Sequence, residues 1–329
     1  MGTFLATLSP MLTLFFCIAI GFCMSKTKLL PDSASKTMAK METWIFCPAL
    51  SFMTMARFCT LDTFATNAFR VGMGCATVLI SIAIAISLSY LFARKDQTER
   101  GVYRYALAFA NFGYMGDPIV LTLFGEEILS YYKLFTLPFS ILVYVWGIGV
   151  LTPKSDEKWS SLRRLLNAPT IATFVGIAVG LTGLGGRLPA FFTSAVDSLK
   201  ACMGPVAMLL AGVTIAKYNV LSMLKNKRVY LATALRLFVI PAFLVLALSG
   251  IKLLLGRCVG ESFGNDVLFL AFFATATPLG LNTVVFPEAY GGSPETGAGM
   301  ALISHTLCIV SIPILYALMV LVFGIPFGG

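Results

Sequence analysis

The stretch Asn111-Phe112-Gly113-Tyr114-Met115-Gly116-Asp117-Pro118 interrupts a long apolar segment near its middle, and Ala274-Thr275-Ala276-Thr277-Pro278-Leu279-Gly280-Leu281-Asn282 interrupts a second one in the same way. Proline removes a backbone donor and clashes with the preceding helical turn, while glycine lowers helix stability. Lipid cannot satisfy the freed backbone groups, so such breaks persist only where protein or water surrounds them. Paired breaks of this kind indicate a binding site between two halves of a membrane protein.

Composition shows that lipid is the solvent of this chain. Its residues are 58% hydrophobic and 12% charged, and the mean hydropathy is +0.87, well above the soluble range. We expect an all-α integral membrane protein, because the apolar runs are too long and too uniform for barrel strands. The ten expected spans are Phe4–Met24, Ala39–Ala56, Phe69–Ala93, Tyr103–Phe124, Leu134–Leu151, Thr170–Leu184, Leu199–Ala216, Val229–Leu255, Val267–Ala289 and Ala298–Phe323.

The two halves of the chain share landmarks at nearly constant spacing. The matched positions are Pro10 with Pro169, Gly21 with Gly180, Pro31 with Pro189, Pro48 with Pro205 and Pro118 with Pro278. Each half holds five spans, an odd number, so the second half enters the membrane from the opposite face. The sequence therefore predicts two inverted five-helix repeats, 1–152 and 169–329, joined by a cytoplasmic linker, 153–168.

The basic residues predict the orientation. One side collects sixteen Lys and Arg residues in four groups of four, at 26–40, 94–104, 154–164 and 217–228, whereas the other collects seven. The positive-inside rule makes the richer side cytoplasmic and places both termini outside the cell membrane. The seven residues of the poorer side are Arg57, Arg70, Lys133, Arg187, Lys200, Lys252 and Arg257. No nucleic-acid partner is expected, because the basic residues lack aromatic interleaving.

Each break contains a residue that favours a helix N-cap, followed by proline. Asp117-Pro118 and Thr277-Pro278 therefore predict a new half-helix at each point, with its N-terminus near the centre of the membrane. Such ends attract anions. Asp117 would occupy the first N-terminus with its own carboxylate or would carry a coupling proton, whereas Thr277 leaves the second N-terminus open to a ligand.

The candidate substrate site follows from these breaks. We expect Asn111 and Asn282 to donate hydrogen bonds to an anion, although both amides would alternatively serve only to satisfy the broken backbone. The predicted site residues are Asn111, Gly113, Gly116, Asp117, Pro118, Thr277, Pro278, Gly280 and Asn282.

Four other polar residues lie in or near the spans. Arg236 would snorkel or pair, or would supply a counter-charge to the anion. His305, the only histidine, would form an interhelical hydrogen bond or titrate near neutral pH. Lys40 and Glu42 are expected at the membrane interface. No cofactor and no metal site are expected, since the cysteines are scattered and no cluster of metal ligands occurs.

The motifs resemble those of a known family. The span-four stretch 111–118, the run 276–283, and Phe286-Pro287-Glu288-Ala289-Tyr290-Gly291-Gly292 before Leu302-Ile303-Ser304-His305-Thr306 resemble the bacterial branch of the auxin efflux carrier (AEC) family, relatives of the plant PIN exporters. The resemblance covers essentially the whole chain. It implies a ten-helix fold similar to bile-acid symporters and sodium/proton antiporters, with a scaffold, often dimeric, and a moving transport domain. Asp117 departs from the family pattern, where an apolar residue is more usual.

The leading hypothesis is a secondary transporter of a small organic anion, such as malate or malonate, coupled to H⁺ or Na⁺ or to neither. ATP drive is not expected, since no Walker-type motif occurs. A cation/proton antiporter is the nearest alternative, although Asp117 is the only firm intramembrane carboxylate. An integral membrane enzyme is the alternative from another class, but the sequence has a single histidine and no paired acidic motif near a span to supply catalytic residues. A channel or a receptor is a further alternative, although the inverted repeat argues against both.

Overall fold

The computed structural model describes residues 2–151, 166–219, 225–255, 261–284, 286 and 294–324. The described residues are almost entirely helical, and the β-structure among them is one isolated antiparallel bridge between Ala110 and Leu279. Six described helical segments are long and apolar enough to cross a bilayer: Phe4–Lys26, Phe64–Phe92, Phe112–Leu151, Ala190–Ala216, Lys227–Leu254 and Glu295–Phe323. The chain is therefore an all-α protein of the membrane-spanning type.

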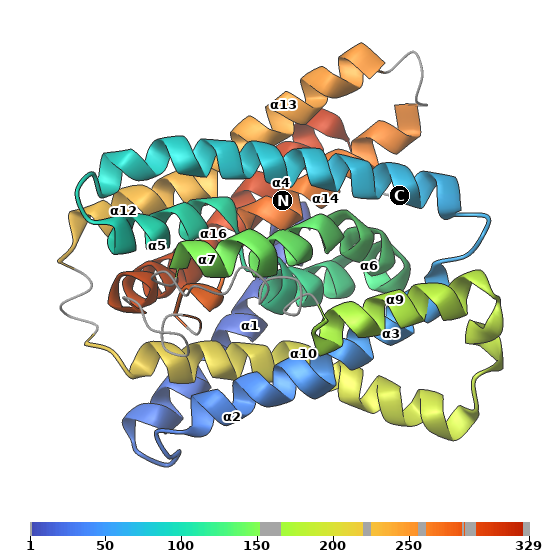
Figure 1. The fold of residues 1–329 in the computed structure, drawn as a ribbon, viewed down its shortest axis with the longest axis horizontal. Coiled ribbons are helices and arrows are strands. Elements are labelled where there is room, and N and C mark those ends of the chain that lie inside the picture. The colour runs from blue at the N-terminus through green and yellow to red at the C-terminus, as the bar shows by residue number, and fades with distance from the viewer. Residues whose placement is uncertain are drawn as a thin grey trace.

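The first half of the chain forms α1 to α7 (Figure 1). The helices are α1 (Gly2–Lys26), α2 (Ala34–Met41), α3 (Cys47–Phe58), α4 (Phe64–Phe92), α5 (Gln97–Ala108), α6 (Asp117–Leu142) and α7 (Ile148–Leu151). Three π-helical turns are also present: η1 (Glu42–Phe46) joins α2 to α3, η2 (Phe112–Gly116) runs directly into α6, and η3 (Val143–Gly147) joins α6 to α7. Because α2, η1 and α3 are continuous, the second expected span begins at Ala34 rather than at Ala39.

The second half of the chain is also built from α-helices and short helical turns. It contains α9 (Ala168–Leu181), the 3₁₀ turn η4 (Leu184–Arg187), α10 (Ala190–Ala216), α12 (Lys227–Ala234), the π turn η5 (Leu235–Val239), α13 (Ile240–Leu255), α14 (Glu261–Ala276) and α16 (Pro294–Phe323). Most of the linker 153–168 and most of the motif 286–292 lie outside the described residues.

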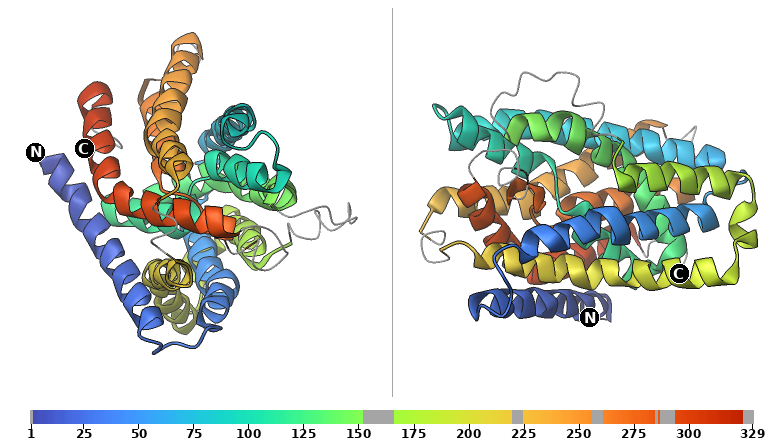
Figure 2. Two further views of the ribbon diagram at one scale, coloured as in Figure 1. Left: turned by 90° about the vertical axis from the view of Figure 1, so that its left-hand side faces the viewer. Right: turned by 60° about the horizontal axis from the view of Figure 1, so that its bottom comes forward.

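Helices α1, α3, α9 and α10 pack together along one side of the molecule, in the lower part of Figure 1. Figure 2 shows α1 beside α10. Close approach explains the glycines at these contacts. A side-chain carbon at Gly21 of α1 would collide with the carbonyl oxygen of Leu209 in α10, and one at Gly180 of α9 would lie 2.6 Å from the carbonyl oxygen of Met55 in α3. Bulkier residues would push these helices apart.

The remaining helices form a second group. Helix α4 packs on α5 and α6, α13 packs on α14, and α12 packs on α16. The chain turns sharply inside α6 at Gly125, where φ is +83° and ψ is −177°, a conformation that favours glycine. Helical structure resumes at Glu126, eight residues before the expected start of span five at Leu134. Lys133 therefore lies inside a helix and not in a connecting loop.

Candidate functional site

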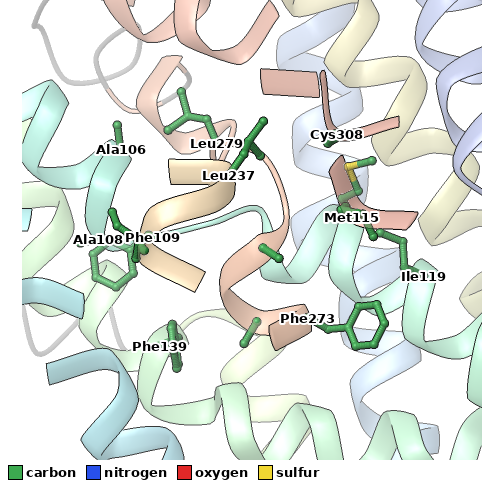
Figure 3. Packing of buried hydrophobic residues seen from close by; sticks show 14 of the residues in the cluster. Ala106, Ala108, Phe109, Met115, Ile119, Phe139, Leu237, Phe273, Leu279 and Cys308 are labelled. Carbon is green, nitrogen blue, oxygen red and sulfur yellow. The ribbon is translucent and has the colours of Figure 1, made fainter. Parts of the chain in front are cut away.

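Two extended segments cross at the centre of the molecule. One follows α5 at Phe109–Asn111, and the other follows α14 at Thr277–Gly280. The backbone N–H of Asn111 donates to the carbonyl oxygen of Pro278 at 2.7 Å, and Ala110 forms the bridge with Leu279. Figure 3 shows Phe109, Met115 and Leu279 from the two broken segments within the surrounding apolar packing. The breaks therefore satisfy part of each other's backbone hydrogen-bonding groups, as buried non-helical chain requires.

The two half-helices restart at points other than those predicted. The first begins with the π turn at Phe112, because the Asn111 carbonyl accepts from the N–H groups of Met115 at 3.1 Å and Gly116 at 3.0 Å. The carboxylate of Asp117 caps no helix end. Pro118 follows directly after this π turn, at the second residue of α6, and removes one intrahelical donor there.

The second break also ends later than predicted. A helical turn resumes at Asn282, where the Gly280 carbonyl accepts from the Thr283 hydroxyl at 2.7 Å. The Thr277 hydroxyl is buried and has no hydrogen-bond partner among the described residues. The predicted caps at Asp117 and Thr277 were therefore wrong, because proline and a cap-forming residue do not fix which residue of the turn comes first.

Helix α16 supports the crossing through two adjacent side chains. Ser304 Oγ accepts from the backbone N–H of Leu279 at 3.2 Å. His305 Nδ1 lies 2.7 Å from the Ala301 carbonyl oxygen, which only accepts, so Nδ1 carries the hydrogen. Its Nε2 then accepts from the Asn111 side-chain amide at 3.3 Å. This is the interhelical role considered for His305, and it leaves Asn111 one amide hydrogen and its oxygen for another partner.

A buried ion pair lies beside the crossing. Lys133 Nζ is 2.6 Å from Asp117 Oδ2, and the two side chains are only 11% and 1% exposed. The sequence placed Lys133 in a loop on the poorly basic side, and the structure corrects this because α6 resumes at Glu126. The apolar and aromatic neighbours on both sides of Lys133, from Tyr131 to Phe135, were the signal that this residue is buried.

A cavity of about 110 Å³ opens at the crossing. Since one water needs about 10–15 Å³, this volume holds a group of several heavy atoms. Five predicted site residues line it: Asn111, Gly113, Asp117, Gly280 and Asn282. The lining also includes residues that the sequence did not indicate, chiefly Lys133, Tyr105, Tyr114, Tyr144, Thr43 and Thr136. One cation, one carboxylate, three amides and several hydroxyl groups therefore line a common space.

The other predicted residues lie outside this lining. Gly116 packs against the Tyr132 hydroxyl, and the Pro118 ring packs on Gly204 of α10. The Tyr132 hydroxyl donates toward the carbonyl oxygens of Phe112 at 3.0 Å and Phe273 at 3.3 Å, so it ties the two broken helices together. Neither Thr277 nor Pro278 lines the cavity, and neither does His305. Their roles in the described structure are to shape and hold the crossing.

Arg236 is buried, with 1% exposure, and does not snorkel. Its Nη1 lies 3.4 Å from the carbonyl oxygen of Leu107, in the last turn of α5, and Ser81 donates to the neighbouring carbonyl of Ala108 at 2.8 Å. The guanidinium therefore stands at the negative end of a helix dipole that terminates inside the protein. Arg236 does not line the cavity.

An ionic network lies further along α3 than the cavity. Ser51 is the last residue of α3 that lines the cavity, and Arg57 follows it about two turns later. Arg57 contacts Glu126 at 3.1 Å and Asp197 at 2.7 Å, while Lys200 contacts Glu126 at 2.7 Å and Asp197 at 3.0 Å. Glu126 belongs to α6, whereas the other three residues belong to α3 and α10, so the network joins the two helix groups.

The family match identifies the chain as a membrane transport protein. Residues 6–316 match the family of membrane transport proteins, so the chain belongs to that family, the AEC family that its motifs resemble. It is a transport protein and not an enzyme. Among curated proteins, the chain is similar to one from Rhizobium meliloti (strain 1021) named "Putative malonate transporter", with 24% identity over 312 residues that cover 92% of each chain.

Proposed function

We propose that this protein is a secondary transporter of a small organic anion, with a mono- or dicarboxylate such as malonate or malate as its substrate. One observation carries the proposal: the cavity at the crossing is lined by Lys133 together with the amides of Asn111 and Asn282. An ammonium group and amide donors are the groups that hold a carboxylate in a site with little water. The name of the relative from Rhizobium supports malonate as the first substrate to test.

Binding would proceed by exchange of partners at Lys133. The ammonium has three donors, and one of them is directed at Asp117 Oδ2. An incoming carboxylate would accept from another of these donors and from the free amide hydrogen of Asn111. Asp117 keeps the buried ammonium compensated when the site is empty, because an unpaired charge there is costly. The two breaks thus differ in charge: the first carries the ion pair of Asp117 with Lys133, whereas Thr277 at the second is neutral.

Alternating access would arise from motion between the two helix groups. We assign α1, α2–α3, α9 and α10 to a scaffold and the remaining helices to a transport domain that moves as an elevator around the crossing. The contacts between α1 and α10 and between α9 and α3 support two inverted five-helix repeats, 1–152 and 169–329, because exchanging the halves turns one contact into the other.

The assembly in the cell completes the proposal. The charge asymmetry of the loops favours a multi-pass protein of the cell membrane with both termini outside and the linker 153–168 in the cytoplasm. A homodimer would form through the scaffold, as the family resemblance implies. Coupling to H⁺ or Na⁺ is part of the same hypothesis.

Uptake by purified protein in liposomes tests the function. Labelled malonate, malate and lactate would be offered in turn, with sodium and pH varied. We expect saturable uptake of at least one carboxylate, a weaker apparent affinity in Asn111→Ala, and no change in Gln97→Ala, where an exposed amide outside the cavity is lost. Thermal stabilisation by sodium alone, with no carboxylate bound or transported, would refute the proposal and favour a cation antiporter.

A further inference from the structure

Glu42 occupies an unusual position for a carboxylate. It opens the π turn η1 between α2 and α3, its side chain has 0% exposure, and neither carboxyl oxygen has a hydrogen-bond partner among the described residues. Glu42 is buried inside the protein, and the helix that leads to it begins at Ala34, about two turns earlier. π turns occur frequently at functional sites.

The elements packed against η1 offer Glu42 no cation. Helix α10 carries Asp197 and Lys200, which are engaged with Arg57 and Glu126. Helix α9 has no titratable side chain from Ala168 to Leu181. On its own continuous helix, Lys36 and Lys40 are exposed and Arg57 belongs to the ionic network. Among the described residues, Cys47 and Tyr114 interact electrostatically with Glu42, and Cys47 also interacts with Lys133 and Asp117.

The state of the carboxyl group follows from this environment. An ionised carboxylate that is buried without a partner costs far more free energy than a neutral one. In this conformation Glu42 therefore carries its proton. Its ionised form requires a hydrogen-bond donor, and no described residue donates to it.

The cavity lies directly next to Glu42. The neighbouring Thr43 and Cys47 both line it. Tyr114, in the π turn after the first break, also lines the cavity and interacts with the Thr43 side chain. The Thr43 hydroxyl donates to the Ala39 carbonyl at 2.8 Å. The crossing thus meets the helical turn that carries Glu42 at the contact between Tyr114 and Thr43.

We propose that Glu42 is a proton-binding site of the scaffold that holds its proton while Tyr114 rests on Thr43 and releases it to cavity water when the crossing moves away. The inference rests on the proposed transport function, because that motion is the transport step. In each cycle Glu42 takes one proton from cavity water on the side from which the anion enters and gives it to cavity water on the opposite side, and no other bond changes. The anion would consequently move together with a proton, and a pH gradient would drive its accumulation.

Infrared spectroscopy tests the proton site without any substrate. A protonated carboxyl group has a C=O stretching band that is distinct from the bands of a carboxylate. We expect the purified wild-type protein to show such a band at neutral pH, Glu42→Gln to lack it, and Asp62→Asn, which removes an exposed carboxyl group, to retain it. Identical spectra of the wild type and Glu42→Gln in this region would overturn the assignment. Unchanged thermal unfolding of Glu42→Gln is also expected, since the amide replaces a neutral group of the same shape.

Transport in liposomes tests the coupling. An inward proton gradient should stimulate malonate uptake by the wild type, and Glu42→Gln should lose this stimulation while it retains exchange of malonate for malonate. Gradient stimulation that persists in Glu42→Gln would overturn the coupling although transport itself is confirmed. Absence of transport of any carboxylate by the wild type would instead refute the proposed function and the coupling with it, while the infrared band stands as a separate result.

Discussion

The pair of Lys133 and Asp117 allows stability and binding to be separated. Its charges are 2.6 Å apart and almost fully buried. Lys133→Met leaves the carboxylate of Asp117 buried and unpaired, which should lower the free energy of unfolding by about 3–5 kcal/mol. The double variant Asp117→Asn/Lys133→Met removes both charges and should regain most of that loss, since replacement of a whole buried pair is often neutral.

Binding should follow a different course in the same variants. A hydrogen bond to a charged group contributes about 1.5–3 kcal/mol, so loss of the ammonium should weaken malonate about 10- to 150-fold, at about 1.4 kcal/mol for each factor of ten. The double variant should therefore unfold near the wild-type temperature yet bind poorly. Thermal unfolding in detergent and isothermal titration calorimetry with malonate measure the two quantities. Wild-type affinity in the double variant would refute the role given to Lys133.

Three other substitutions test separate parts of the structure. Asp117→Asn should raise malonate affinity, because Lys133 is no longer shared, and a pH profile of uptake that survives this change excludes Asp117 as the proton carrier. Glu126→Gln should weaken the ionic network and so expose the buried Cys59. In a background without other cysteines, a membrane-impermeant maleimide should then label Cys59 more strongly, whereas Glu127→Gln should leave the labelling unchanged. Gly74→Ala should lower the unfolding temperature, because its methyl group meets the Phe135 carbonyl, while Gly72→Ala, with no atom within 4 Å, should not.

Much of the helical layout is readable from the sequence, because a bilayer requires long apolar runs. The spans Phe4–Met24 and Phe69–Ala93 lie within α1 and largely within α4. Short turns between spans are harder to locate. Gly125 turns the chain within a single residue, and the charged residues that follow it look like a loop in the sequence although they are helical.

The candidate site was predicted in part, for a comparable reason. Asn111, Gly280 and Asn282 stand out locally because polar and glycine residues are rare in apolar runs. Lys133 and Thr43 reach the cavity from other helices, and their positions depend on packing that no local pattern encodes. The predicted caps failed because proline and a cap-forming residue do not fix which residue opens the turn, and helical structure resumes at Phe112 and at Asn282 instead.

A structure of the protein with malonate, determined by electron cryomicroscopy, tests the central claim most directly. The account predicts density for the dicarboxylate in the cavity at the crossing, within hydrogen-bonding distance of Lys133 Nζ and of the Asn111 amide. Density at another place, or a bound malonate that touches neither of these groups, would contradict it.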